Sequence, residues 1–301
     1  MNSIGFVGLG AMGRHMAARL AGSCDLVVHD VDAAAVASAC AQGARASGSL
    51  RALADQVETV LCSLPTPQVV RDVILGDDGL CHGAKVRRIV DLSTIGPSMA
   101  QTLALALRER GIAFIDSPVS GGTSGAAAGT LTLMVAGDPE AIGAVRPQLD
   151  RIGSTVLVVG ETPGQGQTVK LVNNMLFASN LVAAYEATAM AVSAGVPAER
   201  LLEVVNASSG RSYITEKRVH PVLDRDFALR FATGLLRKDV RLAIQEADAA
   251  GAMLFTARAA AQLLEIAQAQ GLSGEDYTVL AILFEQWNGV KLARDSAGTP
   301  K

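Results

Sequence analysis

The sequence contains few charged residues and no cluster of positive charge. Charged residues make up 18% of the 301 positions, the net charge is −3, and no basic run exceeds two residues. Because proteins that bind nucleic acids normally present clustered lysine and arginine, we expect no nucleic-acid partner. Half of the residues are hydrophobic, so the chain can bury a large core, and this composition argues against disorder.

Cysteine and histidine are also scarce. None of the four cysteines forms a CxxC pair, and the four histidines are scattered without the spacing of metal ligands. We therefore predict reduced thiols and no metal site.

No segment of the sequence is both long and free of polar residues, as a membrane span requires. The best candidate, residues 169–196, contains several asparagines, among them Asn180, and also Glu186. The apolar stretch near the N-terminus has no positively charged segment before it and is interrupted by Arg14 and His15, which argues against a secretory signal peptide. We therefore expect a cytoplasmic protein without a membrane partner.

Short apolar runs alternate with helical patterns through the first half of the sequence. Such alternation is typical of βαβ units around a parallel sheet. The predicted strands are Ile4–Val7, Leu26–His29, Val57–Cys62, Ile89–Leu92, Ile112–Ile115, Thr130–Val135 and Thr155–Val159. The predicted helices between them are Met12–Ala21, Ala33–Ala41, Pro67–Ile74, Pro97–Arg110 and Pro139–Asp150.

After Pro163 the periodicity becomes helical and stays helical. One long helix is predicted from about Gly166 to Ala194, where a glycine and then Pro197 stop it. We therefore expect a Rossmann-type, doubly wound α/β domain over residues 1–163 and an all-α domain over residues 164–301, joined by the long helix. The second domain is expected to bind substrate and to mediate dimerisation.

A glycine-rich motif follows the first predicted strand and opens the first predicted helix. It comprises Gly8, Leu9, Gly10, Ala11, Met12 and Gly13. In this GxGxxG pattern the first glycine permits a tight turn, the second lets the backbone approach a pyrophosphate, and the third lets helix and sheet pack closely. The start of the helix adds free N–H groups and a positive dipole that favour an anion. The motif therefore predicts a dinucleotide site.

Asp30 ends the second predicted strand, about 20 residues after the motif, where dinucleotide-binding domains place an acidic residue. Its carboxylate can accept hydrogen bonds from the adenosine ribose hydroxyls and would repel a 2′-phosphate. Val31 and Asp32 follow it, and no arginine occurs before Arg45. We therefore predict NAD as the cofactor, in preference to NADP.

Six ordered blocks extend over nearly the whole sequence. They are GFVGLGAMG (5–13), SLPTPQVV (63–70), DLSTIGP (91–97), DSPVSGGTSGAAAGTL (116–131), GQGQTVKLVNNM (164–175) and KDVRLA (238–243). Together they resemble the β-hydroxyacid dehydrogenase family, which includes 3-hydroxyisobutyrate dehydrogenase and tartronate semialdehyde reductase. The resemblance implies an NAD-dependent oxidoreductase that moves a hydride between nicotinamide and a small 3-hydroxy acid or its semialdehyde.

Lys170 and Asn174 lie four residues apart in the long predicted helix and therefore share a face. Their neighbours are mostly apolar, so burial would lower the pKa of Lys170 and allow general acid–base chemistry near neutral pH. A lysine here can instead extend its amine to the surface. The resemblance implies the first role, because the family's catalytic lysine falls on Lys170 and its supporting asparagine on Asn174, both in contact with substrate.

Ser120, Gly121 and Gly122 follow a predicted strand. Two glycines after a hydroxyl can offer adjacent backbone N–H groups to an anion, although the same residues can form an ordinary turn. The resemblance implies that this block binds the substrate carboxylate.

Several other positions match residues that the family places near the cofactor. Lys238 lies in the family's KDL block, which here reads KDV, and Phe231 falls where the family has a phenylalanine near the nicotinamide. From the sequence alone, Lys238 can equally be a solvated lysine and Phe231 a core residue. The ends of the third and fourth predicted strands face a cofactor in this fold. These ends carry Leu64, Pro65, Ser93 and Thr94.

Alternative functions use the same architecture. A reductase of tartronate semialdehyde, succinic semialdehyde or glyoxylate would need the same residues. An imine reductase usually lacks the lysine, and a phosphogluconate-type decarboxylating enzyme would need a cluster of cations for its phosphate. The alternative of another class is a non-catalytic NAD-binding scaffold, against which Lys170 and Asn174 argue.

The identity of the hydroxy acid and the direction of the reaction do not follow from the sequence. Arg211 can bind a second anionic group of the substrate or lie on the surface, and the sequence favours neither. The long apolar helix predicts a homodimer or homotetramer.

Overall fold

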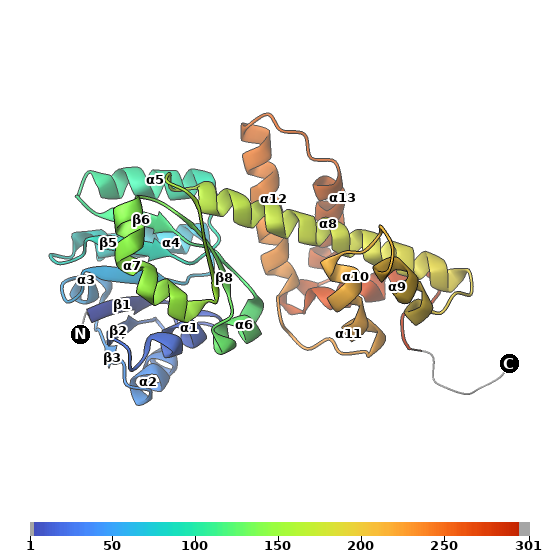
Figure 1. Cartoon of the computed structure of the whole chain (residues 1–301), viewed down its shortest axis with the longest axis horizontal. Coiled ribbons are helices and arrows are strands. Elements are labelled where there is room, and N and C mark those ends of the chain that lie inside the picture. The colour runs from blue at the N-terminus through green and yellow to red at the C-terminus, as the bar shows by residue number, and fades with distance from the viewer. Residues whose placement is uncertain (1–2, 295–301) are drawn as a thin grey trace. The chain divides into compact units, whose positions relative to one another are not determined.

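The computed structural model describes residues 3–294. The chain divides into two compact units, Met1–Leu171 and Val172–Lys301. The first unit combines a sheet with helices, whereas the second is helical (Figure 1).

A nine-stranded sheet organises the first unit. Its strands are β1 (Ser3–Val7), β2 (Asp25–His29), β3 (Arg45–Ala46), β4 (Thr59–Cys62), β5 (Arg88–Asp91), β6 (Ala113–Asp116), β7 (Val119–Ser120), β8 (Thr132–Ala136) and β9 (Thr155–Gly160). They are arranged in the order β3-β2-β1-β4-β5-β6-β8-β7, and β9 pairs with β8. The part from β3 to β6 has the strand order of a doubly wound dinucleotide-binding fold.

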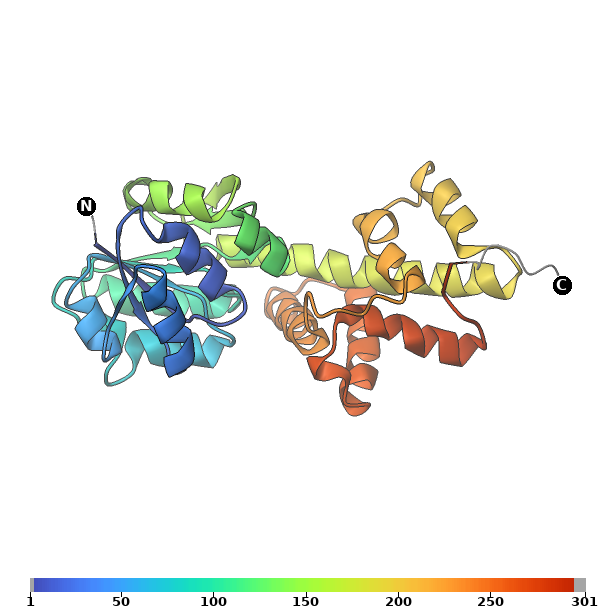
Figure 2. The same cartoon turned by 90° about the horizontal axis from the view of Figure 1, so that it is seen from below.

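Helices cover both faces of this sheet (Figures 1 and 2). They are α1 (Gly13–Leu20), α2 (Ala33–Ala41), α3 (Leu50–Ala54), α4 (Pro67–Leu75), α5 (Pro97–Arg108), α6 (Gly122–Ala128) and α7 (Pro139–Ile152), with a short 3-10 helix at Leu80–His82. Successive strand residues point to opposite faces, so Phe6 joins the core beneath α1 and α7, and Val7 joins the core beneath α3, α4 and α5. Burial on both faces explains why the strands read as continuous apolar runs.

The second unit is built from helices around one apolar core. The long helix α8 (Gln165–Ser193) begins in the first unit and continues through the second. The other helices are α9 (Ala198–Asn206), α10 (Tyr213–Lys217), α11 (Val219–Leu223), α12 (Thr233–Ala249), α13 (Thr256–Ala269) and α14 (Leu280–Asn288), with 3-10 turns at Leu272–Gly274 and Tyr277–Val279. Tyr185 of α8, Leu236 of α12 and Leu264 of α13 lie in the core. The predicted fold class is therefore confirmed.

The structure differs from the prediction where elements are short. Strands β3 and β7 have two residues each, and α3, α6, α10 and α11 have five to seven, so none produces a periodic pattern long enough to recognise. In addition, β8 runs antiparallel to β6 and β7, whereas the prediction was a parallel sheet.

Helix α8 is the one helix within residues 3–294 that is long and apolar enough to cross a membrane, by length and composition alone. Of its most apolar window, 33% is buried inside the fold. Core helices of proteins that do not enter membranes pass the same test.

Candidate active site

The glycine-rich motif forms the turn between β1 and α1. Gly8 has a φ of +92°, which glycine adopts without strain, and a Cβ at Gly13 would lie 1.8 Å from the Gly8 carbonyl oxygen. A Cβ at Gly10 would meet no protein atom within 4 Å. The first and third glycines are therefore needed by the fold itself, whereas the second leaves open space in front of the turn, as an approaching pyrophosphate requires.

Asp30 is fixed beside this turn, at the end of β2. Its Oδ2 accepts a hydrogen bond from the Leu9 N–H at 2.5 Å, and its Oδ1 accepts one from the Asp32 N–H at 2.8 Å. Val31 is fully exposed, and Asp32 caps α2 through the Ala34 N–H at 2.9 Å. Two carboxylates therefore lie beside the glycine-rich turn.

A pocket of about 370 Å³ starts at the glycine-rich turn and extends between α1 and α2. Gly10 and Ala11 line it at one end, and alanines of both helices line much of the rest. Arg14 is the one cation among the lining residues, and it is not among the predicted site residues. Its place one residue after the motif was the signal that could have pointed to it.

The loops after β4 and β5 are joined by a hydrogen bond. The Leu64 N–H donates to the Ser93 hydroxyl at 2.9 Å, and the Ser93 N–H donates to Asp91 Oδ1 at 3.1 Å. Pro65 is exposed and Thr94 is half-buried. The structure thus brings two of the four residues predicted at these strand ends into direct contact.

The Ser120–Gly122 block forms the end of β7 and the start of α6. Ser120 is the last residue of β7, and Gly121 precedes the first turn of α6. Gly121 and Gly122 have φ values of +135° and +66°. The block is thus not a plain turn, because two successive glycines with positive φ connect a strand directly to a helix.

Lys170 and Asn174 lie one turn apart on α8, and both are nearly buried. Lys170 is 8% exposed and Asn174 is 5% exposed. The Asn174 amide donates from Nδ2 to Asp239 Oδ2 at 2.6 Å, and its Oδ1 accepts from Asn173 at 3.1 Å. The Asn174 side chain is therefore held in one orientation.

Asp239 of α12 is the hydrogen-bond partner of Asn174, and it is not among the predicted site residues. It is 3% exposed, and its Oδ1 lies 3.1 Å from Lys238 Nζ. One buried carboxylate therefore links Lys238 and Asn174, although Asn174 and Asp239 are 65 residues apart in the sequence. The KDV block contains Asp239, but the block predicted a role for Lys238 alone.

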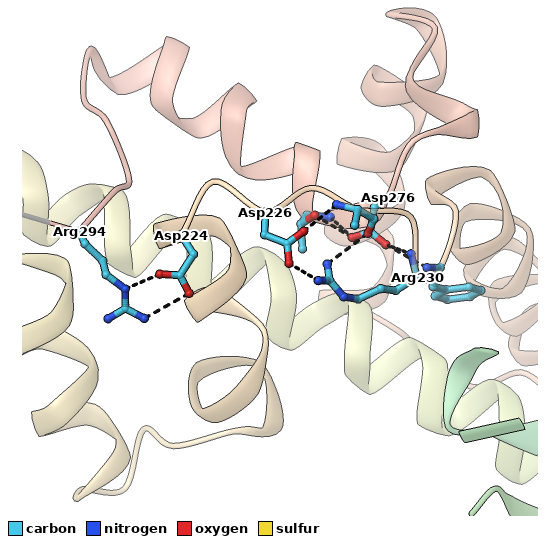
Figure 3. A network of polar contacts seen from close by, with 8 residues as sticks. Asp224, Asp226, Arg230, Asp276 and Arg294 are labelled. Carbon is cyan, nitrogen blue, oxygen red and sulfur yellow. Dashed lines mark hydrogen bonds and ion pairs between the residues drawn. The ribbon is translucent and has the colours of Figure 1, made fainter. Parts of the chain in front are cut away.

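Phe231 is held through its backbone by a second buried carboxylate. Asp276 Oδ2 accepts from the N–H groups of Arg230 at 2.8 Å and Phe231 at 2.9 Å, and Asp276 is completely buried. Figure 3 shows Asp276 directed at this backbone and Asp226 paired with the Arg230 side chain. The centroid of the Phe231 ring lies 6.5 Å from the centroid of the Tyr277 ring, in an edge-on arrangement.

The described residues hold no group of three or more His, Cys, Asp or Glu side chains suited to a metal ion. The prediction that the protein has no metal site stays a prediction. Cys24, Cys40, Cys62 and Cys81 are all free. Arg211 is exposed, which leaves both of its suggested roles open.

Both parts of the chain match known protein families. Residues 3–160 match the NAD-binding domain of 6-phosphogluconate dehydrogenase, and residues 164–284 match the NAD-binding domain of NADP-dependent 3-hydroxyisobutyrate dehydrogenase. The chain is 37% identical to 2-(hydroxymethyl)glutarate dehydrogenase of Eubacterium barkeri, covering 96% of this chain and 97% of that protein. It is also 37% identical to the NAD-dependent L-serine dehydrogenase of Pseudomonas aeruginosa, covering 96% and 100%.

A solved structure supports the same assignment. The Mycobacterium tuberculosis 3-hydroxyisobutyrate dehydrogenase with L-serine superposes with a TM-score of 0.87 at 30% identity, covering 94% of this chain and 99% of that one. The resemblance inferred from the sequence blocks is confirmed. The chain therefore belongs to the β-hydroxyacid dehydrogenase family of NAD-binding oxidoreductases.

Proposed function

We propose that the chain is an NAD-dependent dehydrogenase of a small 3-hydroxy acid, related in its chemistry to 3-hydroxyisobutyrate dehydrogenase, in which Lys170 is the general acid and base. The burial of Lys170, 8% exposed on the same face of α8 as Asn174, is the observation that carries this proposal. A lysine whose pKa is lowered by its surroundings can act as a general acid and base near neutral pH.

Each polar group of the site has a defined task in this proposal. In oxidation, Lys170 Nζ takes the proton of the substrate hydroxyl, and in reduction it returns a proton to the carbonyl oxygen. Asn174, oriented by Asp239, directs its amide at the same oxygen. Ser120 and the two glycines after it bind the substrate carboxylate, which fixes the position of the reacting carbon.

We assign cofactor binding to residues at the ends of the parallel strands and to two residues of the second unit. NAD, when bound, supplies the nicotinamide ring that accepts or donates hydride. The turn from Gly8 to Gly13 would hold the pyrophosphate and Asp30 the adenosine ribose. The remaining cofactor-binding residues in this assignment are Leu64, Pro65, Ser93, Thr94, Phe231 and Lys238. Residues 1–163 then form the dinucleotide-binding domain, and residues 164–301 the substrate and dimerisation domain.

The protein is expected to act in the cytoplasm as a homodimer or homotetramer, without nucleic-acid or membrane partners. One face of α8 supports the oligomer, because Val172, Leu176 and Met190 are 45%, 52% and 75% exposed. Exposed apolar side chains at helical spacing on one helix are typical of surfaces that pack against another chain.

The proposal is tested by assaying NADH formation with a panel of 3-hydroxy acids, and NADH consumption with tartronate semialdehyde, succinic semialdehyde and glyoxylate. The panel separates a dehydrogenase from a reductase, and absence of turnover with every compound would indicate an NAD-binding scaffold. Lys170→Met removes the amine while preserving the length of the side chain. Its kcat should fall by about 1,000-fold, the scale of general acid–base catalysis, while NADH affinity changes little.

Lys217→Met is a matched control, because Lys217 is an exposed lysine on α10. It should retain the kcat of the wild type. Partial recovery of Lys170→Ala by added methylamine would support the assignment, whereas near-normal kcat in Lys170→Met would defeat it.

A further inference from the structure

The start of α8 is capped by a residue from a distant strand. Gly164, which precedes the helix, has no side chain and a φ of +103°. The helix is capped instead by Asp116, the last residue of β6. Its Oδ1 accepts a hydrogen bond from the Gly164 N–H at 3.0 Å, and its Oδ2 accepts one from the Gln167 N–H at 2.8 Å. The first turn of α8 is therefore fixed to the carboxyl end of the sheet.

The glycine at position 166 is explained by the same contact. A Cβ there would lie 2.3 Å from the Met134 carbonyl oxygen and 2.7 Å from Asp116 Oδ2. The Gly164 and Gly166 pair of the GQGQTVK block thus allows α8 to start directly against β6 and β8. Lys170 follows one turn later on this fixed helix.

Gln167 joins the same turn to the loop after β5. Its side chain is completely buried. Its Oε1 accepts from the N–H groups of Ile95 at 2.9 Å and Gly96 at 3.2 Å, and its Nε2 donates to the Ser93 carbonyl at 3.0 Å. A planar amide offers acceptor lone pairs and N–H donors in one neutral group, so it fills all three positions at once, which an ionised carboxylate cannot do.

The loop held by Gln167 contains residues assigned to the cofactor. Ser93 also accepts from the Leu64 N–H through its hydroxyl at 2.9 Å, so the loop after β4 is tied to the same set of bonds. Gln167 and Lys170 are three residues apart and share a face of α8. The bonds of this one amide therefore fix both the loop that would face the cofactor and the turn that precedes Lys170.

We propose that Gln167 is a positioning residue that sets the distance between Lys170 and the cofactor-facing loop Ser93–Gly96. The proposal rests on the proposed role of Lys170. A misplacement of reacting groups by about 1 Å can lower a rate about 100-fold without loss of binding. Loss of the Gln167 bonds should therefore reduce kcat and leave the affinities for NADH and hydroxy acid nearly unchanged.

Two variants and one control test this role. Gln167→Met has a similar length but loses all three bonds, and its kcat should fall by roughly 30- to 100-fold, while KM and the dissociation constant for NADH change by less than about threefold. Gln167→Glu keeps two acceptor bonds, and only its protonated form can also donate to Ser93. Its kcat relative to the wild type should therefore rise as the pH is lowered. Gln165→Met is the matched control, because Gln165 is exposed and its Oε1 accepts from the Thr162 N–H at 3.0 Å, away from the loop after β5.

The outcomes separate this proposal from the proposed function. Wild-type kcat in Gln167→Met, together with an inactive Lys170→Met, would overturn the positioning role and leave the function of Lys170 intact. Equal losses of kcat and NADH affinity in Gln167→Met would also overturn it, because they would report a damaged cofactor site. Normal turnover in Lys170→Met would overturn the proposed function and this proposal with it.

Discussion

The glycine-rich turn of the first unit and the Asn174 side chain of the second unit are fixed in different ways. In the first unit, carboxylates at strand ends hold backbone N–H groups: Asp30 accepts from Leu9 at 2.5 Å, and Asp116 accepts from Gly164 at 3.0 Å. In the second unit, Asp276 holds backbone N–H groups in the same way, whereas Asp239 holds another side chain, the Asn174 amide, at 2.6 Å. The first arrangement fixes the course of the chain, and the second fixes the orientation of one side chain.

This difference has consequences for substitution. Sites formed by backbone require glycine where the chain turns or approaches another segment, so an added Cβ displaces the site itself. A site formed by side chains can lose one partner while the backbone stays in place. We therefore expect substitutions at the glycine-rich turn of the first unit to change cofactor binding or stability. Substitution of Asp239 in the second unit should change turnover, as expected also for the buried side chains Gln167 and Lys170 of the first unit.

Among substitutions that test this comparison, the largest effect is expected for Gly13→Ala. Its Cβ would lie 1.8 Å from the Gly8 carbonyl oxygen, so the turn must move, at a cost of about 1–3 kcal/mol in stability. NADH affinity should fall at least about 100-fold, or about 2.8 kcal/mol, as measured by fluorescence titration alongside thermal unfolding.

Gly10→Ala separates the loss of NADH affinity from the loss of stability, which occur together in Gly13→Ala. Its Cβ meets no protein atom within 4 Å, so the unfolding temperature should stay at the wild-type value while NADH affinity falls about tenfold. Unchanged affinity in Gly10→Ala would show that the pyrophosphate does not approach this glycine.

The fold was largely predictable because its main elements have local signals. Burial on both faces makes β1, β2, β4, β5 and β6 read as short apolar runs, and α8 was predicted to within about one residue at each end, from Gly166 to Ala194 against Gln165 to Ser193. The direction of β8 was not predictable, because an antiparallel strand at the edge of a parallel sheet has the same apolar pattern as a parallel one.

The candidate site was predictable only where its chemistry is local. The GxGxxG turn and the Lys170–Asn174 pair each lie within a few residues. Asp116, Gln167 and Asp239 were missed because their partners are distant: 65 residues separate Asn174 from Asp239, and 74 separate Gln167 from Ser93. Buried carboxylates and amides of this kind are recognised from their hydrogen bonds, which a single sequence does not contain.

Asp239→Asn tests the second unit. It removes the charge that pairs with Lys238 and weakens the hold on Asn174, so kcat should fall roughly 30-fold, or about 2 kcal/mol. NADH affinity should change little, in contrast to Gly13→Ala. Asp248→Asn is a matched control on the same helix, since Asp248 is exposed and forms an ion pair with Arg258. Parallel losses of kcat and NADH affinity in Asp239→Asn would remove the distinction between the glycine-rich turn and the Asn174–Asp239 pair.

Asp30→Asn should have a smaller effect, on cofactor preference. Without the negative charge, the ratio of kcat/KM for NADPH to that for NADH should rise about tenfold, or about 1.4 kcal/mol. Asp32→Asn removes a neighbouring charge that caps α2 and should change the ratio less. A higher kcat/KM with NADPH than with NADH in the wild type would contradict the predicted preference for NAD.

Asp116→Asn should change the dependence of stability on pH and leave the cofactor preference unaffected. Burial raises the pKa of Asp116 from 3.8 to about 7, although the N–H groups of Gly164 and Gln167 oppose the shift, and the buried Asp91 on β5 adds to it. Between these values the folded chain holds one proton more at Asp116 than the unfolded chain. The stability that this proton contributes is complete below pH 4 and is lost as the pH rises to about 7.

Between pH 4 and about 7 the unfolding free energy of the wild type should fall relative to that of Asp116→Asn by up to about 1.4 kcal/mol per pH unit. Urea unfolding of both proteins at pH 5, 6, 7 and 8 measures this, because the other titrating groups are common to both. Parallel curves would show that Asp116 ionises at its ordinary pKa and that the cap of α8 is charged throughout.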